Sequence, residues 1–293
     1  MGFCRIGAAA EIVYAGLHFG EEPPISGTRG SGTIFFPGCN LRCVFCQNYQ
    51  ISQEFKLHPS QKLTTGELAS AMIRLQDAGA HNINFVSPSH MVFQMADAIG
   101  IARHQGLQVP IVYNSNGYDS LAVLRKIRGL VDIYLPDIKY LDNNLGKRYS
   151  AVVDYAETIP AVLGEMLDQV GDLQLDDQGI AVRGLLVRHL VLPGCLEDSR
   201  NCLRWLAGLS STMSVSIMAQ YSPQHRAYRY PEINRCLTGD EYQAIVDYAL
   251  ELGLDNAFVQ DLASQEQQRP DFTKPQPFVW TDCGPAALGK PTI

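Results

Sequence analysis

Residues 32–46 read GTIFFPGCNLRCVFC, a short β-rich run followed by three closely spaced cysteines. The cysteines Cys39, Cys43 and Cys46 form a C-x3-C-x2-C pattern on one loop directly after the predicted strand. Three thiolates on so short a loop can converge on a single inorganic centre. Because cysteinate sulfur is the normal ligand of iron–sulfur clusters, the spacing predicts a cluster with one iron open to another ligand.

Two alternatives to a cluster are a structural zinc site completed by a distant His or Cys, and three buried thiols that pack as small hydrophobic groups. Structural zinc usually has four protein ligands in two separated pairs, a pattern that differs from this one. The cysteines with no cluster spacing are interpreted as buried or surface thiols: Cys195, Cys202, Cys236 and Cys283.

Short β-rich runs alternate with helical patterns from Gly32 to about Ser222, which is typical of parallel strands joined by crossover helices. The predicted strands are Gly32–Phe36, Asn82–Ser87, Pro110–Ser115, Val131–Ile138, Leu185–Leu192 and Val215–Gln220. The predicted helices are residues 65–79, Met91–His104, Ser120–Ile127, Asp154–Gln169 and Arg200–Leu209. Six such units predict an α/β fold, a partial (β/α)6 TIM-like barrel.

The flanking segments complete the predicted organisation. We expect residues 1–30 to be an N-terminal extension with at most one strand, and residues 31–235 to form the partial barrel. Residues 236–293 are expected to form a C-terminal helix, a short strand and a coil tail that pack on the barrel. The loop Tyr221–Arg235 is long enough to act as a lid.

Composition excludes several functional classes. The chain has 293 residues, of which 46% are hydrophobic, so it can bury a substantial core. Its 23 Lys and Arg against 30 Asp and Glu give a formal net charge of −7, which disfavours nucleic acid and anionic membranes as partners. No apolar run reaches the roughly 18 residues that a membrane span requires. We predict a soluble cytoplasmic protein.

The region around the cysteines resembles a known family. The cysteine spacing, with Phe45 before the third cysteine and Asn48 after it, resembles the radical S-adenosylmethionine (radical SAM) superfamily. Residues 17–27, 27–52 and 230–235 are similar to its pyruvate formate-lyase activating enzyme-like subgroup. The resemblance implies a [4Fe–4S] cluster on the three cysteines and S-adenosylmethionine on the open iron. It also implies that reductive cleavage of this cofactor yields a 5′-deoxyadenosyl radical, which abstracts a hydrogen atom.

The resemblance further implies cofactor contacts at the ends of the second and third predicted strands. Ser87 and Ser89 stand where relatives commonly carry a Gly-Gly-Glu that meets the methionine amine, so their hydroxyls are expected to take this role. The adjacent His90 either joins the cofactor site or begins a helix facing water. The segment containing Asn114, Ser115 and Asn116 resembles the ribose-binding segment of the activating enzymes, although its Asn-Gly pair is also an ordinary turn signal.

Later strands carry the charged candidates. Asp137 and Lys139 resemble an Asp-Leu-Lys motif that meets the methionine end or the substrate, and they are the predicted catalytic pair. Because they lie two residues apart on a strand, their side chains share a face; the alternative is a simple salt bridge. Arg188 resembles the arginine that faces the cofactor carboxylate. Gln220 or His225 is expected to replace the histidine that relatives carry near the adenine.

Three functional hypotheses follow. The leading one is an activating-type radical SAM oxidoreductase that abstracts hydrogen from a backbone glycine of a partner protein, through the wide mouth of a partial barrel. The second is a radical SAM enzyme for a small or anionic molecule, with Tyr221–Arg235 and His18–Glu22 closing the mouth, and the third is a metal-binding module without turnover. Reduced flavodoxin or ferredoxin is the expected electron donor, and Arg226, Arg229 and Arg235 would suit an acidic flavodoxin or an anionic substrate, or belong to a solvated loop.

Overall fold

The computed structural model describes residues 3–54, 60–267 and 269–278. Its main sheet has the strand order β11-β10-β9-β7-β6-β5-β3-β2, and β8 pairs with β9 off this path. The strands are β2 (Tyr14–His18), β3 (Ser31–Phe35), β5 (Ile83–Val86), β6 (Ile111–Asn114), β7 (Ile133–Tyr134), β8 (Gln174–Leu175), β9 (Ala181–Leu190), β10 (Ser214–Met218) and β11 (Ala257–Val259). From β3 to β11 the neighbouring strands along this path are parallel, as crossover connections require.

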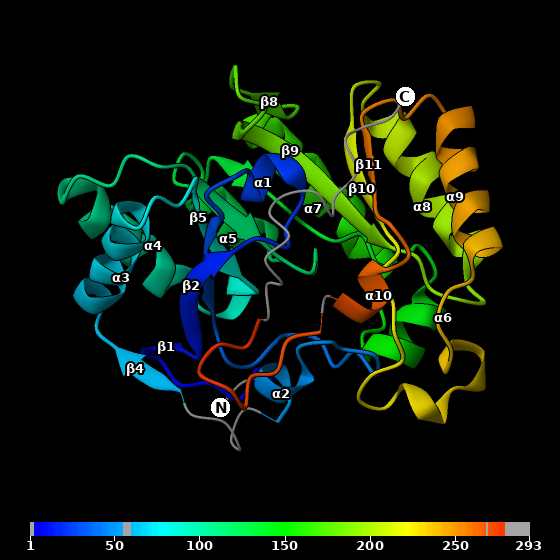
Figure 1. The fold of residues 1–293 in the computed structure, drawn as a ribbon, viewed down its shortest axis with the longest axis horizontal. Coiled ribbons are helices and arrows are strands. Elements are labelled where there is room, and N and C mark those ends of the chain that lie inside the picture. Colours follow the sequence, from blue (N-terminus) through cyan, green and yellow to red (C-terminus); the bar gives the residue numbers. More distant parts are fainter. Residues whose placement is uncertain (1–2, 55–59, 268, 279–293) are drawn as a thin grey trace.

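The sheet curves into a partial barrel with helices on its outer face (Figure 1). In the described part of the chain the end strands β2 and β11 do not pair, so the barrel has an open side. The longer helices are α3 (Thr65–Asp77), α4 (Val92–His104), α5 (Leu121–Lys126), α7 (Tyr155–Val170), α8 (Leu196–Leu209) and α9 (Gly239–Glu251). The predicted α/β class and partial barrel are confirmed.

Helix starts follow local chemistry. Thr64 accepts a hydrogen bond from the Glu67 amide while the Glu67 carboxylate accepts one from the Thr64 amide, so both unpaired amides at the start of α3 are satisfied. Thr238 and Glu241 form the same capping box at the start of α9. None of the helices among the described residues is both long and apolar enough to cross a bilayer.

The predicted strand Val131–Ile138 is much shorter in the structure, where regular pairing in β7 covers only Ile133–Tyr134. The reason is Pro136, which has no amide hydrogen to donate to the ladder. Pairing with β9 resumes as an isolated bridge between Asp137 and Arg188. The interruption leaves these two side chains next to each other inside the barrel.

The N-terminal thirty residues contain more regular structure than expected. The strand β1 (Ala10–Ile12) pairs with β4 (Gln61–Leu63), and β2 joins the edge of the main sheet antiparallel to β3. A short helix, α1 (Pro23–Ser26), then crosses the amino end of the barrel. Its Ile25 is fully buried in a small cluster with residues of β6, β7 and β9. The chain before α1 is thereby fixed inside the barrel.

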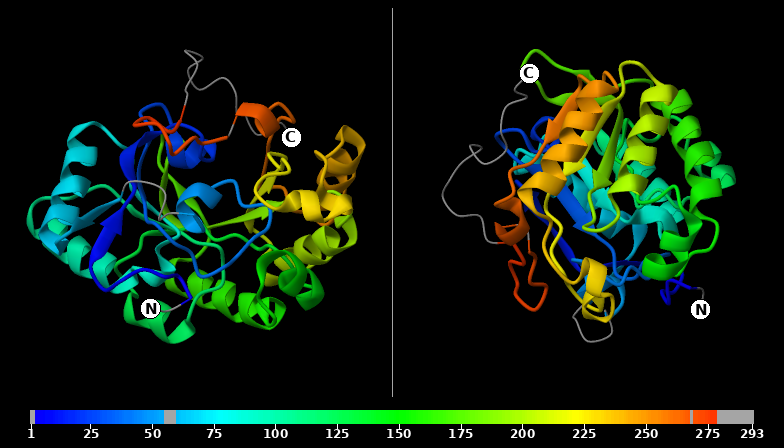
Figure 2. Two further views of the ribbon diagram at one scale, coloured as in Figure 1. Left: turned by 90° about the horizontal axis from the view of Figure 1, so that it is seen from below. Right: turned by 90° about the vertical axis from the view of Figure 1, so that its right-hand side faces the viewer.

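The tail crosses the open side of the barrel (Figure 2). The expected coil begins instead with a short helix, α10 (Ser264–Gln267), near β11. Further on, Phe272 and Phe278 pack against Phe35 of β3, each with ring centroids 5.5 Å apart, and Phe278 also contacts Tyr14 of β2. The part of the predicted tail from residue 279 onward lies outside the described residues.

The remaining short elements are connections between these larger units. They are α2 (Tyr49–Ser52), which follows the cysteine loop, α6 (Asn143–Leu145), a π-helical turn at Gly146–Ser150, and 3-10 turns at Pro88–His90, Ala227–Arg229 and Pro231–Ile233.

Candidate active site

A pocket of about 230 Å³ lies inside the partial barrel. Three groups of residues form its wall: the cysteine loop, the carboxyl ends of the parallel strands, and the segment between β2 and α1. Of the predicted site residues, the following line it: Cys39, Cys43, Phe45, Cys46, Asn48, Ser87, Asn114, Ser115, Asn116, Asp137, Lys139, Arg188 and Gln220. The fold therefore brings residues that are far apart in the sequence into one cavity, as parallel sheets do at the carboxyl ends of their strands.

The cysteine loop leaves β3 through a turn at Gly38, whose φ of +81° favours glycine. A Cβ atom there would lie 2.7 Å from the backbone oxygen of Cys4, so no larger residue fits without movement. The Arg42 guanidinium donates hydrogen bonds to the backbone oxygens of Cys39 and Leu41, which hold the loop in its curved form.

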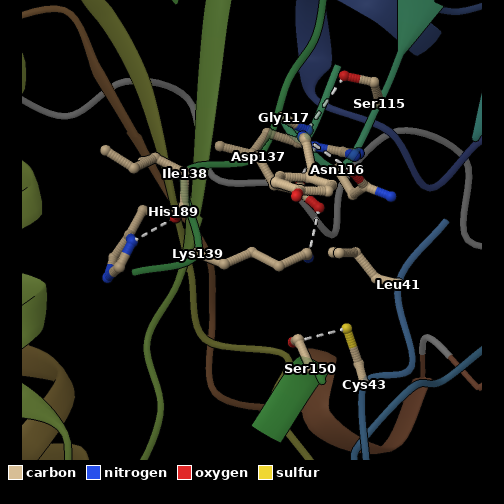
Figure 3. Close-up of polar contacts among 12 residues, drawn as sticks. Leu41, Cys43, Ser115, Asn116, Gly117, Asp137, Ile138, Lys139, Ser150 and His189 are labelled. Atoms are coloured by element: carbon tan, nitrogen blue, oxygen red, sulfur yellow. Dashed lines mark hydrogen bonds and ion pairs between the residues drawn. The ribbon is translucent and has the colours of Figure 1, made fainter. Parts of the chain in front are cut away.

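Each cysteine sulfur has a polar neighbour. Cys43 Sγ lies 3.0 Å from the Ser150 hydroxyl (Figure 3), and Cys46 Sγ lies 3.3 Å from that of Ser52. The Asn116 amide donates to Cys39 Sγ over 3.4 Å. No three His, Cys, Asp or Glu side chains among the described residues converge closely enough to hold a single metal ion.

The three thiols fit an iron–sulfur cluster by their chemistry. Burial, and then the proximity of Cys43, raise the pKa of the Cys39 thiol and raise that of Cys46 to about 12. Thiolates gathered on the wall of one pocket are costly without a compensating positive charge. Iron ions supply that charge, and sulfur ligands on one loop are the set that an iron–sulfur cluster takes.

Asp137 lies between two cations. Its Oδ2 is 2.7 Å from Lys139 Nζ, and its Oδ1 is 2.9 Å from Arg188 Nε. Burial alone would raise the pKa of Asp137, but the charges of Arg188 and Lys139 lower it below its ordinary value. Figure 3 shows Lys139 extending between Asp137 and the cysteine loop at Leu41. The predicted pair is an ion pair of the pocket wall, and its ammonium faces the cysteine loop.

Two acids that the sequence analysis did not single out, Glu21 and Glu22, form the pocket wall next to Arg188. Glu21 accepts hydrogen bonds from the side-chain amides of Asn84 and Asn114 and pairs with Arg188 over 3.2 Å. Burial raises the pKa of both glutamates. Both lie in residues 17–27, which resemble the activating enzyme-like subgroup, but neither was assigned an individual role in the site from the sequence; the antiparallel pairing of β2 with β3 carries them into the barrel.

The polar residues after β6 have different neighbours. Asn114 Oδ1 accepts from Arg188 over 2.5 Å, whereas Ser115 donates to the buried carboxylate of Asp119 over 2.7 Å. Asn116 donates to Asn40 Oδ1 over 2.6 Å and so ties this loop to the cysteine loop. Asn114 and Ser115 thus take part in internal hydrogen bonds on opposite sides of the strand end.

Two predicted site residues, Ser89 and His90, do not line this pocket. His90 Nε2 lies 2.7 Å from the Pro37 backbone oxygen, and the ring packs edge-on against Phe36, so His90 supports the strand before the cysteine loop. His225 also lies outside the lining and stacks on Tyr49, with ring centroids 5.0 Å apart.

Gln220 does line the pocket, and two further glutamines accompany it. Gln47 donates to the Gln220 backbone oxygen over 2.8 Å, and Gln260 donates to its side-chain oxygen over 3.1 Å. Arg269 and Phe278 of the tail line the pocket as well. Sequence reasoning missed these four residues because they come from loops and the tail, where no strand periodicity marks an inward side chain.

Comparison with known proteins identifies the family of this chain. Residues 33–163 match the sequence model of the Radical SAM superfamily. An uncharacterised protein of Methanocaldococcus jannaschii is 32% identical over 263 residues, which cover 87% of this chain and 71% of that protein. The pyruvate formate-lyase-activating enzyme of Clostridium pasteurianum is 24% identical over 198 residues, which cover 66% of this chain and 74% of that enzyme.

Solved structures share the fold. SuiB of Streptococcus suis has a TM-score of 0.54 and 11% identity, with 79% of this chain and 50% of that chain covered. The FeFe-hydrogenase maturase HydG of Carboxydothermus hydrogenoformans has a TM-score of 0.53 and 13% identity, with 81% of this chain and 55% of that chain covered. This chain spans about half the length of both.

The chain belongs to the radical SAM superfamily and is an enzyme of that superfamily. Its cofactors are accordingly a [4Fe–4S] cluster and S-adenosylmethionine.

Proposed function

We propose that Cys39, Cys43 and Cys46 ligate the [4Fe–4S] cluster, and that the pocket beneath them holds S-adenosylmethionine and a substrate. When bound, the two cofactors supply the electron and the 5′-deoxyadenosyl radical for hydrogen abstraction. The observation that carries this proposal is the placement of all three thiols on the wall of one pocket at the carboxyl end of β3. The protein's own task is then to bind and orient the cofactors and the substrate and to exclude water from the pocket.

Named residues have proposed roles in that task. Asn116, tied to the cysteine loop through Asn40, and Asn114 offer amide groups for the ribose hydroxyls. The Lys139 ammonium, held by Asp137 beside the cysteine loop, can donate a hydrogen bond to a carboxylate or carbonyl oxygen of a ligand. We propose Asp137 and Lys139 as the catalytic pair because both line the pocket between the cysteines and Arg188.

The substrate that the geometry supports best is a small molecule. The tail crosses the open side of the barrel and contributes Arg269 and Phe278 to the pocket wall, which narrows the route for a protein loop. Phe272 of the tail is buried against Phe35 of β3, so the tail is held over the open side of the barrel by apolar packing. A small substrate enclosed in this way would also be shielded from water while a radical is present.

A second candidate is activation of a glycyl-radical enzyme. It is supported by the 24% identity to the activating enzyme of Clostridium pasteurianum over 66% of this chain. On this proposal the tail would have to move to admit the loop of a partner protein. The two candidates differ in one observable: a glycyl radical appears on a partner protein only with the second.

The electron donor is proposed to dock beside the cysteine loop. The Arg226 amide donates to the Val44 backbone oxygen over 2.7 Å, so the Arg-rich loop lies directly against the cysteines. Arg226 and Arg229 are the cations that this loop offers to an acidic flavodoxin or ferredoxin. Arg235 is instead paired with Glu241 over 2.7 Å.

Product formation tests the proposed function. The anaerobically reconstituted protein, given S-adenosylmethionine and dithionite, is expected to form 5′-deoxyadenosine. Cys43→Ala should abolish this product, whereas the control Cys236→Ala, at an exposed cysteine outside the pocket, should leave it unchanged. Equal product from the wild type and Cys43→Ala would overturn the proposal. Electron paramagnetic resonance on candidate partner proteins then separates the two substrate classes.

A further inference from the structure

Glu22 lies at the end of the pocket remote from the cysteines. It follows β2, whose last residue, His18, pairs with Ser31 at the amino end of β3. The cysteine loop follows the carboxyl end of the same strand. Since a strand rises about 3.3 Å per residue, the five residues of β3 separate the two ends by about 13 Å. Figure 1 shows α1, directly after Glu22, and α2, directly after the cysteine loop, at opposite ends of the barrel.

Carboxylates outnumber cations around Glu22. Glu21, Glu22 and Asp137 line this region together with only two buried cations, Lys139 and Arg188. The remaining charged and titratable neighbours of the pocket add little here. His18 is held neutral, because burial and Arg188 lower its pKa to about 3, and Arg269 lies on the exposed tail, where it donates to the Gln265 backbone oxygen.

The buried cations are already engaged by other groups. Arg188 directs Nε to Asp137, one terminal nitrogen to Glu21 and the other to Asn114. Lys139 pairs with Asp137. Glu22, only 6% exposed, takes part in none of the ion pairs among the described residues.

Glu22 Oε2 is buried without a hydrogen-bond partner among the described residues. The Ser216 hydroxyl lies beside the Glu22 carboxylate as a donor that lowers its pKa, and Asn84 Oδ1 beside Glu21 is buried without a partner. Buried polar atoms of folded proteins are rarely left unsatisfied, and such atoms call for an explanation. Asn84 Oδ1 and an ionised Glu22 carboxylate can only accept hydrogen bonds, so a further donor would satisfy them, whereas the Ser216 hydroxyl can itself donate to Glu22.

We propose that Glu22 is the counter-ion for a cationic group of the substrate, an ammonium or a guanidinium. The inference rests on the proposed function and specifies its substrate class: an amine or guanidine compound. The cation would lie at Glu22 and the reacting carbon toward the cysteine loop. An ammonium supplies three donors and the charge that balances the third carboxylate. The amine of S-adenosylmethionine is a less suitable source, because the cysteines that would hold the cluster follow the other end of β3.

Binding of small probes tests the charge preference. The probes are n-butylammonium and its neutral and anionic counterparts, n-butanol and butyrate, observed by ligand-detected NMR on cluster-loaded protein with saturating S-adenosylmethionine and no reductant. In the wild type we expect the ammonium to bind at least tenfold more tightly than the alcohol, and butyrate not to bind. Equal affinities for the ammonium and the alcohol would overturn the inference.

Variants assign the preference to Glu22. Glu22→Gln should reduce the ratio of n-butylammonium affinity to n-butanol affinity from tenfold to less than threefold. Ser216→Ala should weaken n-butylammonium binding severalfold. The matched control Glu251→Gln, at an exposed glutamate of α9, should retain the full ratio. If Glu22 were only a structural partner of Arg188, Glu22→Gln would lower the melting temperature and leave the ratio unchanged, which would also overturn the inference.

Two parallel measurements separate this inference from the proposed function. The dissociation constant of S-adenosylmethionine should be the same for the wild type and Glu22→Gln. If Glu22→Gln instead weakened S-adenosylmethionine binding tenfold, Glu22 would belong to the cofactor site, and the substrate assignment would be contradicted. Formation of 5′-deoxyadenosine is measured on the same preparations. Cofactor cleavage without ammonium preference refutes the inference alone, whereas absence of cleavage in the wild type refutes the proposed function.

Discussion

Arg188 is the residue on which the polar interior of the barrel depends. Its guanidinium joins the carboxylates of Glu21 and Asp137, which come from segments more than a hundred residues apart. Burial would lower the pKa of Arg188, but the acidic neighbours, Asp137 first, raise it above its ordinary value. The guanidinium therefore stays charged and lowers the pKa of Asp137, whereas burial still raises that of Glu21.

Removing that charge should be strongly destabilising. Arg188→Met leaves the buried Glu21 without its cation and Asp137 with Lys139 alone, and we expect the free energy of unfolding to fall by about 3–5 kcal/mol. The measurement is urea unfolding followed by circular dichroism. The control Arg125→Met breaks an exposed pair with Glu165 and should cost less than about 1 kcal/mol. Similar losses in both variants would refute the importance of the buried network.

His189 makes stability depend on pH. Its ring is buried behind Arg188, Nδ1 lies 2.8 Å from the Ile138 backbone oxygen (Figure 3), and burial lowers its pKa to about 4. Because the folded pKa lies below the ordinary 6.5, the fold favours the neutral ring. The contribution of the neutral ring to the free energy of unfolding is complete above pH 6.5 and is lost as the pH falls toward 4. In total it amounts to about 3 kcal/mol.

Replacing this ring tests the argument. His189→Gln keeps a donor for Ile138 but cannot titrate, so its stability should vary less between pH 6.5 and 4 than that of the wild type. The exposed control His104→Gln should retain the wild-type slope. Urea unfolding at several pH values gives both slopes, and an unchanged slope for His189→Gln would contradict the assignment.

At the scale of elements, Gly117 lets the turn after β6 pack against the backbone that follows β7. Its φ is +77°, and a Cβ atom there would lie 2.3 Å from the Asp137 backbone oxygen. Gly117→Ala should therefore separate Asn116 from Asp137 and cost about 1–3 kcal/mol of stability. Gly100→Ala is the matched control, because Gly100 lies within α4 with open space around it.

The two glycine substitutions should differ in sign. Alanine is favoured over glycine inside a helix, so Gly100→Ala should stabilise the protein by about 0.5–1 kcal/mol. Thermal unfolding of both variants measures the difference. Stabilisation by Gly117→Ala would show that the turn between β6 and α5 is not fixed as described.

The elements that could be predicted from the sequence were those with a repeating apolar pattern or a recognisable capping motif. Capping residues such as Thr64 and alternating apolar patterns located the helices and the strands between β3 and β10. The cysteine spacing located the loop on the pocket wall. The length of β7 was wrong because one missing amide at Pro136 ends a ladder that the apolar pattern continues. The position of Glu22 was not predicted, because it depends on the antiparallel pairing of β2 with β3, and the first thirty residues were interpreted as an irregular segment with at most one strand.

For the whole molecule, the notable feature is the tail across the open side of the barrel. Phe272 packs between Phe35 and Phe278, and its amide donates to Gln50 beside the cysteine loop. This contact links the end of the described chain to both β3 and the active-site loop. Access to the pocket should thus depend on how firmly the tail is held.

Weakening this contact should open the pocket. Phe272→Ala removes a buried ring, and we expect amide hydrogen exchange in residues 269–278 to accelerate at least tenfold while exchange in the barrel strands is unchanged. The exposed neighbour provides the control, Thr273→Ala, which should leave exchange at its wild-type rate. Equal exchange in the wild type and Phe272→Ala would show that the ring does not hold the tail.

The most direct measurement of the central claim is the metal and sulfide content of protein purified without oxygen. If Cys39, Cys43 and Cys46 ligate the cluster, the wild type should contain about four iron and four labile sulfide per chain, and Cys43→Ala should contain far less of both. Stoichiometric zinc with no labile sulfide in the wild type would contradict the account.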